Sequence, residues 1–414
     1  MSSSSIPDWS VMTLQDLIDR KFTGPSPTCE ERNIATSEEW GLLKTTAVTW
    51  SGWNENAHKV PPRQFWGNSS IEVRQGDVLI TKAGPRNRVG VVVHVPATRS
   101  HLMVSGKMVG LRPSTSKVIP SLLAGLLSTR HAQDYLNSRT TGMAESQTNF
   151  ADEALLQTRL NVPPLPEQRK IAEILDTLDD QIHATEQIIA KLRLTQSGLI
   201  DDLLNFQAKK NQIEQLGKWL ASKPKNGYSP LAVDQWNGVS MLGLGCLSAN
   251  GFSPSQLKNA PPKDPRLRNA LLEDGDLLMT RANTRDLVGF AGVYRDVGHP
   301  CTYPDLMMRL KPVPEVSIDY LEILLNSASI RRQVKNLASG TSGSMVKITG
   351  KIVENLQVVI PHRNVQIEVV DQINAVKNVC NSEIISLNKL LALKRGLCSD
   401  LLTGRVRVPM AASS

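Results

Sequence analysis

The 414-residue sequence contains nearly the same pattern twice, about 198 positions apart. Residues 75–83 (QGDVLITKA) return as residues 274–282 (DGDLLMTRA). Residues 163–168 (PPLPEQ) open a long helical pattern and return as residues 361–366 (PHRNVQ). Each copy is therefore expected to be one globular domain followed by one long helix. A duplicated domain joined to a duplicated helix suits a protein that addresses two separated sites on one ligand.

The two globular segments have a mixed pattern, in which short apolar runs predict strands and Gly, Pro and Asn separate them. Residues 78–80 and 89–93 are strand-like in the first copy, and 277–279 and 290–294 in the second. Residues 121–136 and 320–334 are each expected to form one amphipathic helix. The chain is thus predicted to be an α+β protein with two similar mixed α/β domains.

The two long helices give the clearest periodicity, because apolar residues recur at heptad spacing. The first seam contains Ile171, Leu175, Leu178, Ile182, Ile189, Leu192, Leu199, Leu203 and Phe206. The second contains Val369, Ile373, Val376, Cys380, Leu387, Leu390, Leu397 and Leu401, and Gly404 marks its end. At ~1.5 Å per residue, ~40 residues give a helix of ~60 Å. Because an isolated stripe of this kind is unstable in water, the helices are expected to pair.

Polar residues interrupt each seam at matching places, namely Thr185 and Gln196 in the first helix and Glu383 and Lys394 in the second. If a pseudo-two-fold axis relates the two copies, the helices pair as an antiparallel coiled coil. The register predicted from these interruptions places Thr185 opposite Lys394 and Gln196 opposite Glu383.

These patterns divide the chain into five segments. The predicted boundaries are 1–162 for the first domain, 163–208 for the central helix, 209–360 for the second domain, 361–406 for the distal helix and 407–414 for a tail.

Composition indicates a soluble protein with a moderate preference for polyanions. There are 47 basic and 39 acidic residues, a net charge of +8 and a pI of about 9.2. No apolar run approaches the ~18 residues of a membrane span, and residues 1–5 do not resemble a secretory signal. The five cysteines are scattered without a Cys-x-x-Cys pair, which fits a reducing cytoplasm rather than a disulfide framework or zinc site.

The repeated segments resemble the specificity (S) subunits of type I restriction–modification enzymes. Residues 163–175 (PPLPEQRKIAEIL) are similar to the start of that family's central conserved helix. Residues 275–284 (GDLLMTRANT) and 340–345 (GTSGSM) are similar to segments of its target recognition domains. The resemblance extends over almost the whole chain, although residues 362–365 (HRNV) depart from it.

This resemblance implies a DNA-binding protein without a catalytic site. Each target recognition domain would read one half of a bipartite double-stranded DNA target, and the helices would set the spacing. Two methyltransferase (M) subunits would dock on the helices and methylate adenine at N6. Two restriction (R) subunits would add translocation and cleavage. S-adenosylmethionine, ATP and Mg would belong to these partners, and no cofactor or metal is expected in this chain.

The loops that follow the repeated strands carry residue types that read base edges or bind phosphate. The candidates are Lys82, Arg86, Asn87 and Arg88 in the first copy, Arg281, Asn283, Thr284 and Arg285 in the second, and Lys347. Surface loops are often basic, so solvated side chains are the alternative. Trp40, Trp50, Trp53 and Trp66 crowd the first domain, mostly as packing residues, although one of them could stack on DNA.

The motifs of several enzyme classes are absent from the sequence. There is no phosphate-binding loop, no Asn-Pro-Pro-Tyr/Phe motif and no His-Glu-x-x-His. A nuclease would need clustered carboxylates near a lysine, and Asp77 with Lys82 suggests this only faintly, because Thr81 stands where a carboxylate is wanted. Asp77 and Asp276 are instead expected to cap the turn before their strands. A coiled-coil assembly scaffold without DNA specificity is the alternative from a different class.

Overall fold

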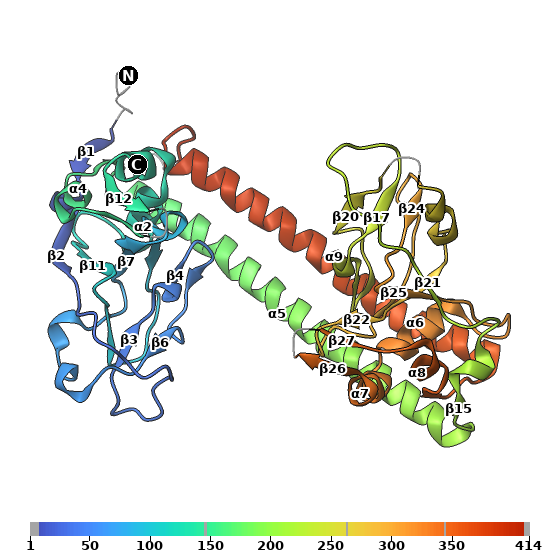
Figure 1. Cartoon of the computed structure of the whole chain (residues 1–414). Helices are drawn as coiled ribbons and strands as arrows, with labels where there is room; N and C mark the ends of the chain where they lie inside the picture. The colour runs from blue at the N-terminus through green and yellow to red at the C-terminus, as the bar shows by residue number, and fades with distance from the viewer. Residues whose placement is uncertain (1–7, 145–146, 262–263, 343–344, 410–414) are drawn as a thin grey trace. The chain divides into compact units, whose positions relative to one another are not determined.

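A computed structural model describes residues 8–144, 147–261, 264–342 and 345–409 (Figure 1). Contacts along the chain define two compact units. Unit 1 contains residues 1–186 and 386–414, and unit 2 contains residues 187–385. Each long helix therefore contributes one part to each unit, and the units are described separately below.

Unit 1 is built around an antiparallel sheet that contains β7 and β11. Its strands and helices are β1 (Ser10–Thr13), α1 (Leu14–Leu17), β2 (Ile18–Phe22), β3 (Gly41–Leu43), β4 (Val48–Thr49), β5 (Gly52–Trp53), β6 (His58–Lys59), β7 (Val78–Thr81), β8 (Ala83–Gly84), β9 (Val92–His94), β10 (Leu102–Met103), β11 (Met108–Pro113), α2 (Pro120–Ser128), α3 (Arg130–Asn137), β12 (Thr140–Ala144), β13 (Gln147–Phe150), α4 (Asp152–Leu156) and β14 (Arg159–Val162).

The central sheet of unit 1 has the order β2-β11-β7-β9, and α2 packs against β7 and β9. One of its two inner strands, β7, is buried at all four residues, of which Val78, Leu79 and Ile80 are apolar. A second sheet, β10-β3-β6, encloses a separate apolar cluster that includes Leu42 and Leu102. Strand β1 pairs with β14, which leads into the central helix.

Unit 2 repeats this order of strands and helices, except that a 3₁₀ turn (Leu216–Trp219) stands in the place of α1. It contains β15 (Glu214–Gln215), β16 (Lys225–Asn226), β17 (Ser240–Leu242), β18 (Leu247–Ser248), β19 (Gly251–Phe252), β20 (Leu257–Asn259), β21 (Leu277–Thr280), β22 (Ala282–Asn283), β23 (Ala291–Val293), β24 (Cys301–Thr302), β25 (Met307–Leu310), α6 (Ile318–Asn326), α7 (Ala328–Leu337), β26 (Ser339–Ser342), β27 (Met345–Lys347), α8 (Gly350–Glu354) and β28 (Gln357–Val358). Short 3₁₀ turns connect several strands in both units.

The central sheet of unit 2 has the order β16-β25-β21-β23, so β21 occupies the place that β7 has in unit 1. Helix α6 packs against β23. Because the same order of strands and helices appears in both units, the duplication predicted from the sequence is a duplication of fold.

The single helix expected in each domain is in fact two helices. Thr129 separates α2 from α3 and has an extended backbone with ψ 149°, and Ser327 separates α6 from α7 with ψ 153°. In each case the hydroxyl donates to a carbonyl three residues earlier, Leu126 O at 2.7 Å and Leu324 O at 2.6 Å. Because the hydroxyl satisfies a carbonyl at the helix end, the first helix can end here although the apolar pattern of the sequence continues.

The two long helices are α5 (Leu165–Lys210) and α9 (Arg363–Leu401). The central helix begins and ends two residues later than predicted, and the distal helix is shorter than the predicted 361–406. In unit 1 the first turns of α5, with Ile171, pack in one core with Leu397 and Leu401 of α9. In unit 2 the last turns of α5, with Leu203, pack in one core with Val369 of α9. The two helices thus pack together and run in opposite directions.

The predicted seam positions on α5 and α9 face protein rather than water. All seventeen of them except Phe206 are buried or half-buried, and Phe206 is 50% exposed. Thr185 is also buried, and its hydroxyl donates to Gln181 O at 2.8 Å. A buried hydroxyl can therefore occupy the seam because its own helix supplies an acceptor.

The polar partner of Lys394 differs from the predicted one. Its ammonium forms an ion pair with Asp179 and not with the predicted Thr185. A carboxylate attracts an ammonium more strongly than a hydroxyl does, and the long lysine stem can reach along the neighbouring helix. The predicted match of Gln196 with Glu383 stays a prediction.

The described part of the predicted tail belongs to unit 1. Arg407 binds Glu167, and Val408 packs against the core that contains Trp9; residues 410–414 lie outside the described residues. All five cysteines are free thiols. Within the described ranges, neither the long helices nor the short ones contain an apolar stretch sufficient to cross a membrane.

Candidate nucleic-acid interface

An aspartate directly precedes each central strand, and its carboxylate accepts hydrogen bonds from an arginine and from a backbone N–H. Asp77 is fully buried and accepts from Arg112 Nε at 2.9 Å, Arg112 Nη2 at 3.0 Å and the backbone N–H of Arg74 at 2.8 Å. Asp276 accepts from Arg309 Nη1 at 2.8 Å and from the N–H of Glu273 at 3.0 Å. The predicted turn-capping role of both aspartates is confirmed.

Each central strand ends in a threonine that closes the following loop. We call residues 82–90 the first loop and residues 281–289 the second loop. Thr81 Oγ1 donates to Arg88 O, and Thr280 Oγ1 donates to Leu287 O at 3.1 Å. The hydrogen bond from this buried hydroxyl joins the start of the loop to a carbonyl near its end, so both ends of the loop are held at the sheet.

The first loop exposes only some of its predicted DNA-binding residues. Arg86 and Asn87 are exposed. Arg88 instead turns inward, where Nη2 donates to Thr45 O and to Val48 O at 3.2 Å. Its charge therefore stabilises the fold, and the loop presents Arg86 and Asn87 to solvent.

Lys82, at the start of the first loop, shares the carboxylate of Asp152 with Lys21. Partial burial raises the pKa of Asp152, but hydrogen bonds from the two lysines outweigh it and leave the pKa below its ordinary value. Lys82 is therefore already bound at this edge. The contacts of Asp152 with Lys21 and Lys82 could not be predicted from the sequence, because 70 residues separate Asp152 from Lys82.

Both arginines of the second loop that were predicted to bind DNA are hydrogen-bonded to backbone carbonyls. Arg281 Nη1 donates to Asp305 O at 3.3 Å, and Arg285 Nη1 donates to Lys335 O at 2.9 Å. Asn283 is half-buried and its Oδ1 accepts from the N–H of Thr284 at 2.8 Å, while Thr284 is exposed. The two loops thus offer different chemistry to a ligand although their sequences are equivalent.

A polar hairpin that was not predicted from the sequence lies beside each loop. In unit 1 the strand order is β12-β13-β8, and Thr148 Oγ1 donates to Gly84 O at 3.2 Å. In unit 2 the order is β22-β27-β26, and Ala282 lies opposite Lys347. Lys347 is exposed next to the second loop, as its prediction as a DNA-binding residue requires. The neighbouring Gly343 and Ser344 lie outside the described residues.

The four tryptophans between residues 40 and 66 divide into three packed residues and one exposed residue. Trp40 is buried and stacks on His101 with ring centroids 4.7 Å apart. Trp53 and Trp66 donate their indole N–H groups to Ala97 O and Pro61 O. Trp50, at the turn between β4 and β5, is 58% exposed and is the one available for stacking.

One buried glutamine joins each long helix to its globular unit. Gln168 donates to Lys117 O and Pro163 O at 2.9 Å and accepts from the N–H of Ile119 at 2.9 Å. Gln366 is its equivalent in unit 2. It donates to Glu315 O and Pro361 O at 3.1 and 2.8 Å and accepts from the N–H of Ser317 at 2.6 Å. The same three hydrogen bonds thus fix the long helix to its globular domain in both units.

The residue before each glutamine differs. Glu167 is buried and accepts from Trp9 Nε1 at 3.0 Å and from Arg407 Nε at 2.7 Å and Nη2 at 2.8 Å. Val365 stands at the equivalent position of unit 2 and is half-buried. Glu167 therefore connects the start of α5 to residues near both ends of the chain, by an ion pair with Arg407 and a hydrogen bond from Trp9.

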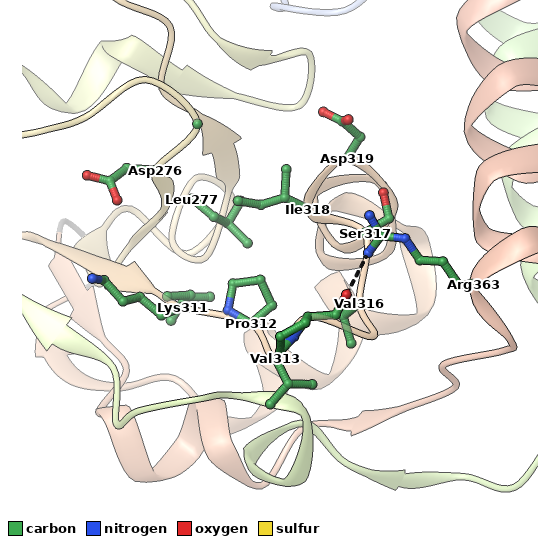
Figure 2. A pocket seen from close by; sticks show the side chains of 13 residues that line it. Asp276, Leu277, Lys311, Pro312, Val313, Val316, Ser317, Ile318, Asp319 and Arg363 are labelled. Carbon is green, nitrogen blue, oxygen red and sulfur yellow. Dashed lines mark hydrogen bonds between the residues drawn. The ribbon is translucent and has the colours of Figure 1, made fainter.

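A hollow of about 420 Å³ in unit 2 lies where β21 and β25 meet α6 and the start of α9 (Figure 2). Asp276, Lys311, Asp319 and Arg363 border it, and Arg363 Nη1 donates to Pro314 O at 3.1 Å. The hollow is at the start of β21, whereas the second loop follows the end of this strand. It therefore belongs to the junction of helix and domain and not to the loop face.

The nuclease alternative would need clustered carboxylates that are free to bind a metal ion. The carboxylate of Asp77 is occupied by Arg112 and by a backbone N–H, and the carboxylate of Asp152 by two lysines. Within the ranges that the structure describes, no group of three or more His, Cys, Asp or Glu side chains could hold a metal ion. What the two loop faces offer instead is hydrogen-bond donors, acceptors and cations.

The geometry defines a class of protein, namely a duplicated α+β chain whose two units present polar loops and share long paired helices. Comparison with known proteins agrees with this class. The family described as the type I restriction modification DNA specificity domain matches residues 69–194. Over these residues the chain is similar to the specificity subunits of type I restriction–modification systems.

Two curated relatives show how far the similarity extends. The EcoEI specificity subunit of Escherichia coli is 32% identical over 188 residues, which are 45% of this chain and 31% of the relative. The EcoKI specificity subunit of Escherichia coli K12 is 27% identical over 267 residues, or 61% of this chain and 57% of the relative. The chain thus spans between a third and three fifths of the length of these two relatives.

Solved structures of the same fold cover the chain more fully. One chain, from a study of complex assembly and conformational transition in a type I R-M system, has a TM-score of 0.57 at 16% identity and covers 98% of this chain and all of its own length. The S subunit from M. genitalium has a TM-score of 0.55 at 12% identity and covers 99% of both chains. At these identities the likeness establishes the fold.

Proposed function

We propose that this chain selects the DNA sequence on which a type I restriction–modification complex acts. Each unit reads one half of a bipartite double-stranded target. The two long helices set the gap between the halves and dock two M subunits, which methylate adenine at N6. R subunits add cleavage to the same complex.

The observation that carries this proposal is the repeated pairing of a loop with a polar hairpin at the end of a buried strand. Arg86 and Asn87 on the first face, and Thr284 and Lys347 on the second, are exposed at these places. Arginine and asparagine form two-point hydrogen bonds with guanine and adenine, and lysine binds phosphate. Since the two faces differ in their exposed residues, they are suited to different half-targets.

The helices suit a spacing and docking role. With 46 and 39 residues, α5 and α9 extend roughly 70 and 60 Å at ~1.5 Å per residue. One turn of DNA is ~34–36 Å, so helices of this length match sites separated by one or more turns. Several apolar side chains on these helices are exposed, with Leu194 at 75% and Ile385 at 56%, and such residues favour a partner protein.

The chain itself would carry no catalytic group. In this proposal S-adenosylmethionine is bound by the M subunits, and ATP and Mg by the R subunits. The contribution of the chain is the placement of those partners over one DNA sequence, because reactive groups held in fixed geometry react far faster than free ones.

The decisive experiment is co-expression with the M subunit of the same system, followed by single-molecule sequencing for N6-methyladenine. A split motif with a fixed gap supports the proposal and gives the target. A stable complex that leaves DNA unmethylated contradicts it.

Two changes test the assignment of roles. Replacing residues 1–160 with those of another family member should alter one half of the motif, and a change in the other half would refute the model. Inserting seven residues into both helices should lengthen the tolerated gap, and an unchanged gap would refute the ruler role.

A coiled-coil assembly scaffold without DNA specificity is the competing function, favoured by the exposed apolar side chains of the helices. Salt separates the two. Binding through phosphates weakens steeply between ~50 and ~200 mM salt, and a scaffold would show no such DNA affinity.

A further inference from the structure

Helix α7 holds the second loop by its backbone. Arg331 is only 7% exposed, and its guanidinium donates from Nη1 to Val288 O and from Nη2 to Asp286 O at 2.8 Å. The centre of the guanidinium is 4.0 Å from the ring centroid of Phe290. A planar guanidinium can bind two carbonyls in one fixed arrangement, so these bonds define where the loop backbone lies.

The charge on Arg331 is bound by carbonyls, because the carboxylate of Asp286 points to Lys335 Nζ at 2.7 Å. Burial lowers the pKa of Arg331, and Asp286 opposes this effect only in part. Burying a charge is unfavourable unless hydrogen bonds satisfy it. An apolar side chain at this position would avoid the cost of burying a charge. What an arginine adds in return is the two hydrogen bonds to the loop.

The loop is also pressed against α7 at its end. Gly289 has φ +82°, and a Cβ there would lie 2.5 Å from Val334 Cγ1 and 2.9 Å from Arg331 Nη1. At the other end of the loop, Arg285 donates to the backbone of Lys335. Contacts at residues 285, 286, 288 and 289 therefore hold the loop on this helix.

Unit 1 uses the same helix position, 198 residues earlier, for the same purpose. Gln133 of α3 donates from Nε2 to Gly90 O at 2.9 Å and to Leu127 O at 2.8 Å. Gly90 has φ +85°, and a Cβ there would lie 2.9 Å from Gln133 Oε1. An amide in one unit and a guanidinium in the other thus fasten equivalent loops.

We infer that Arg331 is a positioning residue for base readout by unit 2, and that Gln133 has this role in unit 1. The inference rests on the proposed function, since it requires that the loops face DNA. Hydrogen bonds to base edges depend strongly on distance and angle. A loop released from its helix would sample several positions and would distinguish bases poorly even where the domain stays folded.

The test uses the S subunit in complex with its M subunit. Methylation rates are measured on duplexes that carry the preferred target or one single-base change in either half. We expect Arg331→Met to reduce discrimination about tenfold in one half and less than twofold in the other. Gln133→Met should weaken discrimination in the opposite half. Arg331→Gln, which keeps one amide donor as in unit 1, should lose less than Arg331→Met.

Arg332→Met is the matched control, because this exposed arginine lies on the same helix and its replacement removes the same charge. It should leave the ratio of rates between correct and changed bases unaltered in both halves. Thermal unfolding of each complex reports folding separately. A merely structural role would lower the amount of active complex without changing these ratios.

The inference is overturned if Arg331→Met and Gln133→Met affect the same half, or if both leave the ratios within twofold of wild type. An equal loss in both halves also overturns it. Failure of the proposed function has a different signature, because the wild-type complex would then show no base preference in either half.

Discussion

The starts of the two long helices are alike in one residue and unlike in the next. Gln168 and Gln366 are both about 1% exposed and bind three equivalent backbone groups. The residue before them is Glu167 in unit 1 and Val365 in unit 2. The shared glutamine therefore fixes each helix to its domain. The neighbouring Glu167 makes contacts that only unit 1 requires.

That requirement follows from the path of the chain. In unit 2 the chain passes without a break from the end of α5 into β15. In unit 1 the end of α9 and the start of β1 come from opposite ends of the chain, and Glu167 binds one residue from each, Arg407 and Trp9. An ion pair and an indole hydrogen bond thus stand in unit 1 where a covalent connection stands in unit 2.

The largest expected effect comes from removing the shared glutamine. Gln168→Met or Gln366→Met keeps the volume but leaves one buried N–H and two buried carbonyls without their partner. At ~1–3 kcal/mol for each unsatisfied group, we expect about 4 kcal/mol of destabilisation in the unit concerned. Urea unfolding with amide hydrogen exchange, which reports each unit separately, measures it.

The matched controls are Gln181→Met on α5 and Gln372→Met on α9, because both glutamines are exposed. Surface substitutions of this kind change stability by about 0.5 kcal/mol or less. A clear difference between the two buried sites would show that the equivalent bonds do not have equal weight.

The next effect compares the two strand-capping ion pairs. Asp77 is fully buried and bound at two points by Arg112, whereas Arg309 binds Asp276 through Nη1. Asp77→Asn should therefore destabilise unit 1 by about 3 kcal/mol, and Asp276→Asn should destabilise unit 2 by about half as much. Chemical unfolding of both variants measures this ratio, and equal losses would contradict it.

Features that repeat at one offset could be predicted from the sequence. The heptad seams gave α5 to within two residues at each end, and the repeated Gly-Asp pair gave both capped strands. Periodicity and turn residues act over short distances, so their signals are local.

Contacts between distant residues could not be predicted. Arg407 and Glu167 are 240 residues apart, and Lys394 and Asp179 are 215 apart. Arg88 was predicted as a DNA-binding residue from its place in the loop, and the carbonyls that it binds in the structure are 43 and 40 residues away. The helix breaks at Thr129 and Ser327 were missed for a different reason, since the apolar pattern continues across each of them.

A smaller effect is expected where the helix starts differ. Glu167→Val copies unit 2 and should destabilise unit 1 by about 2 kcal/mol. The value is less than the ~3–5 kcal/mol for breaking a fully buried pair, because the side chain of Arg407 is 37% exposed and can turn to water. Unfolding measurements on Glu167→Val, with Val365→Ala as the control at the equivalent site, test this.

The same residue predicts a dependence on pH. Burial raises the pKa of Glu167, but hydrogen bonds from Arg407 and Trp9 outweigh it and leave the pKa below its ordinary value of 4.5. The contribution to stability is therefore complete above pH 4.5 and is lost as the pH falls through the lower pKa of the folded state. Wild type should lose stability relative to Glu167→Val as the pH falls below about 4.5, and parallel pH profiles would refute this.

The smallest effect concerns the two loops, and it tests whether their difference matters for DNA. Both Arg86 and Arg285 are exposed, but Nη1 of Arg285 is bound to Lys335 O. If both loops face DNA, Arg86→Gln should weaken binding of the complex about threefold to tenfold. It should also reduce the slope of log K against log salt by about 0.9, the value for one lost phosphate contact. Arg285→Gln should change affinity less than twofold, since its guanidinium is directed at the protein. An equal loss for both arginines would mean that Arg285 leaves Lys335 when DNA binds, so that the loops act alike in the complex despite their difference in the free chain.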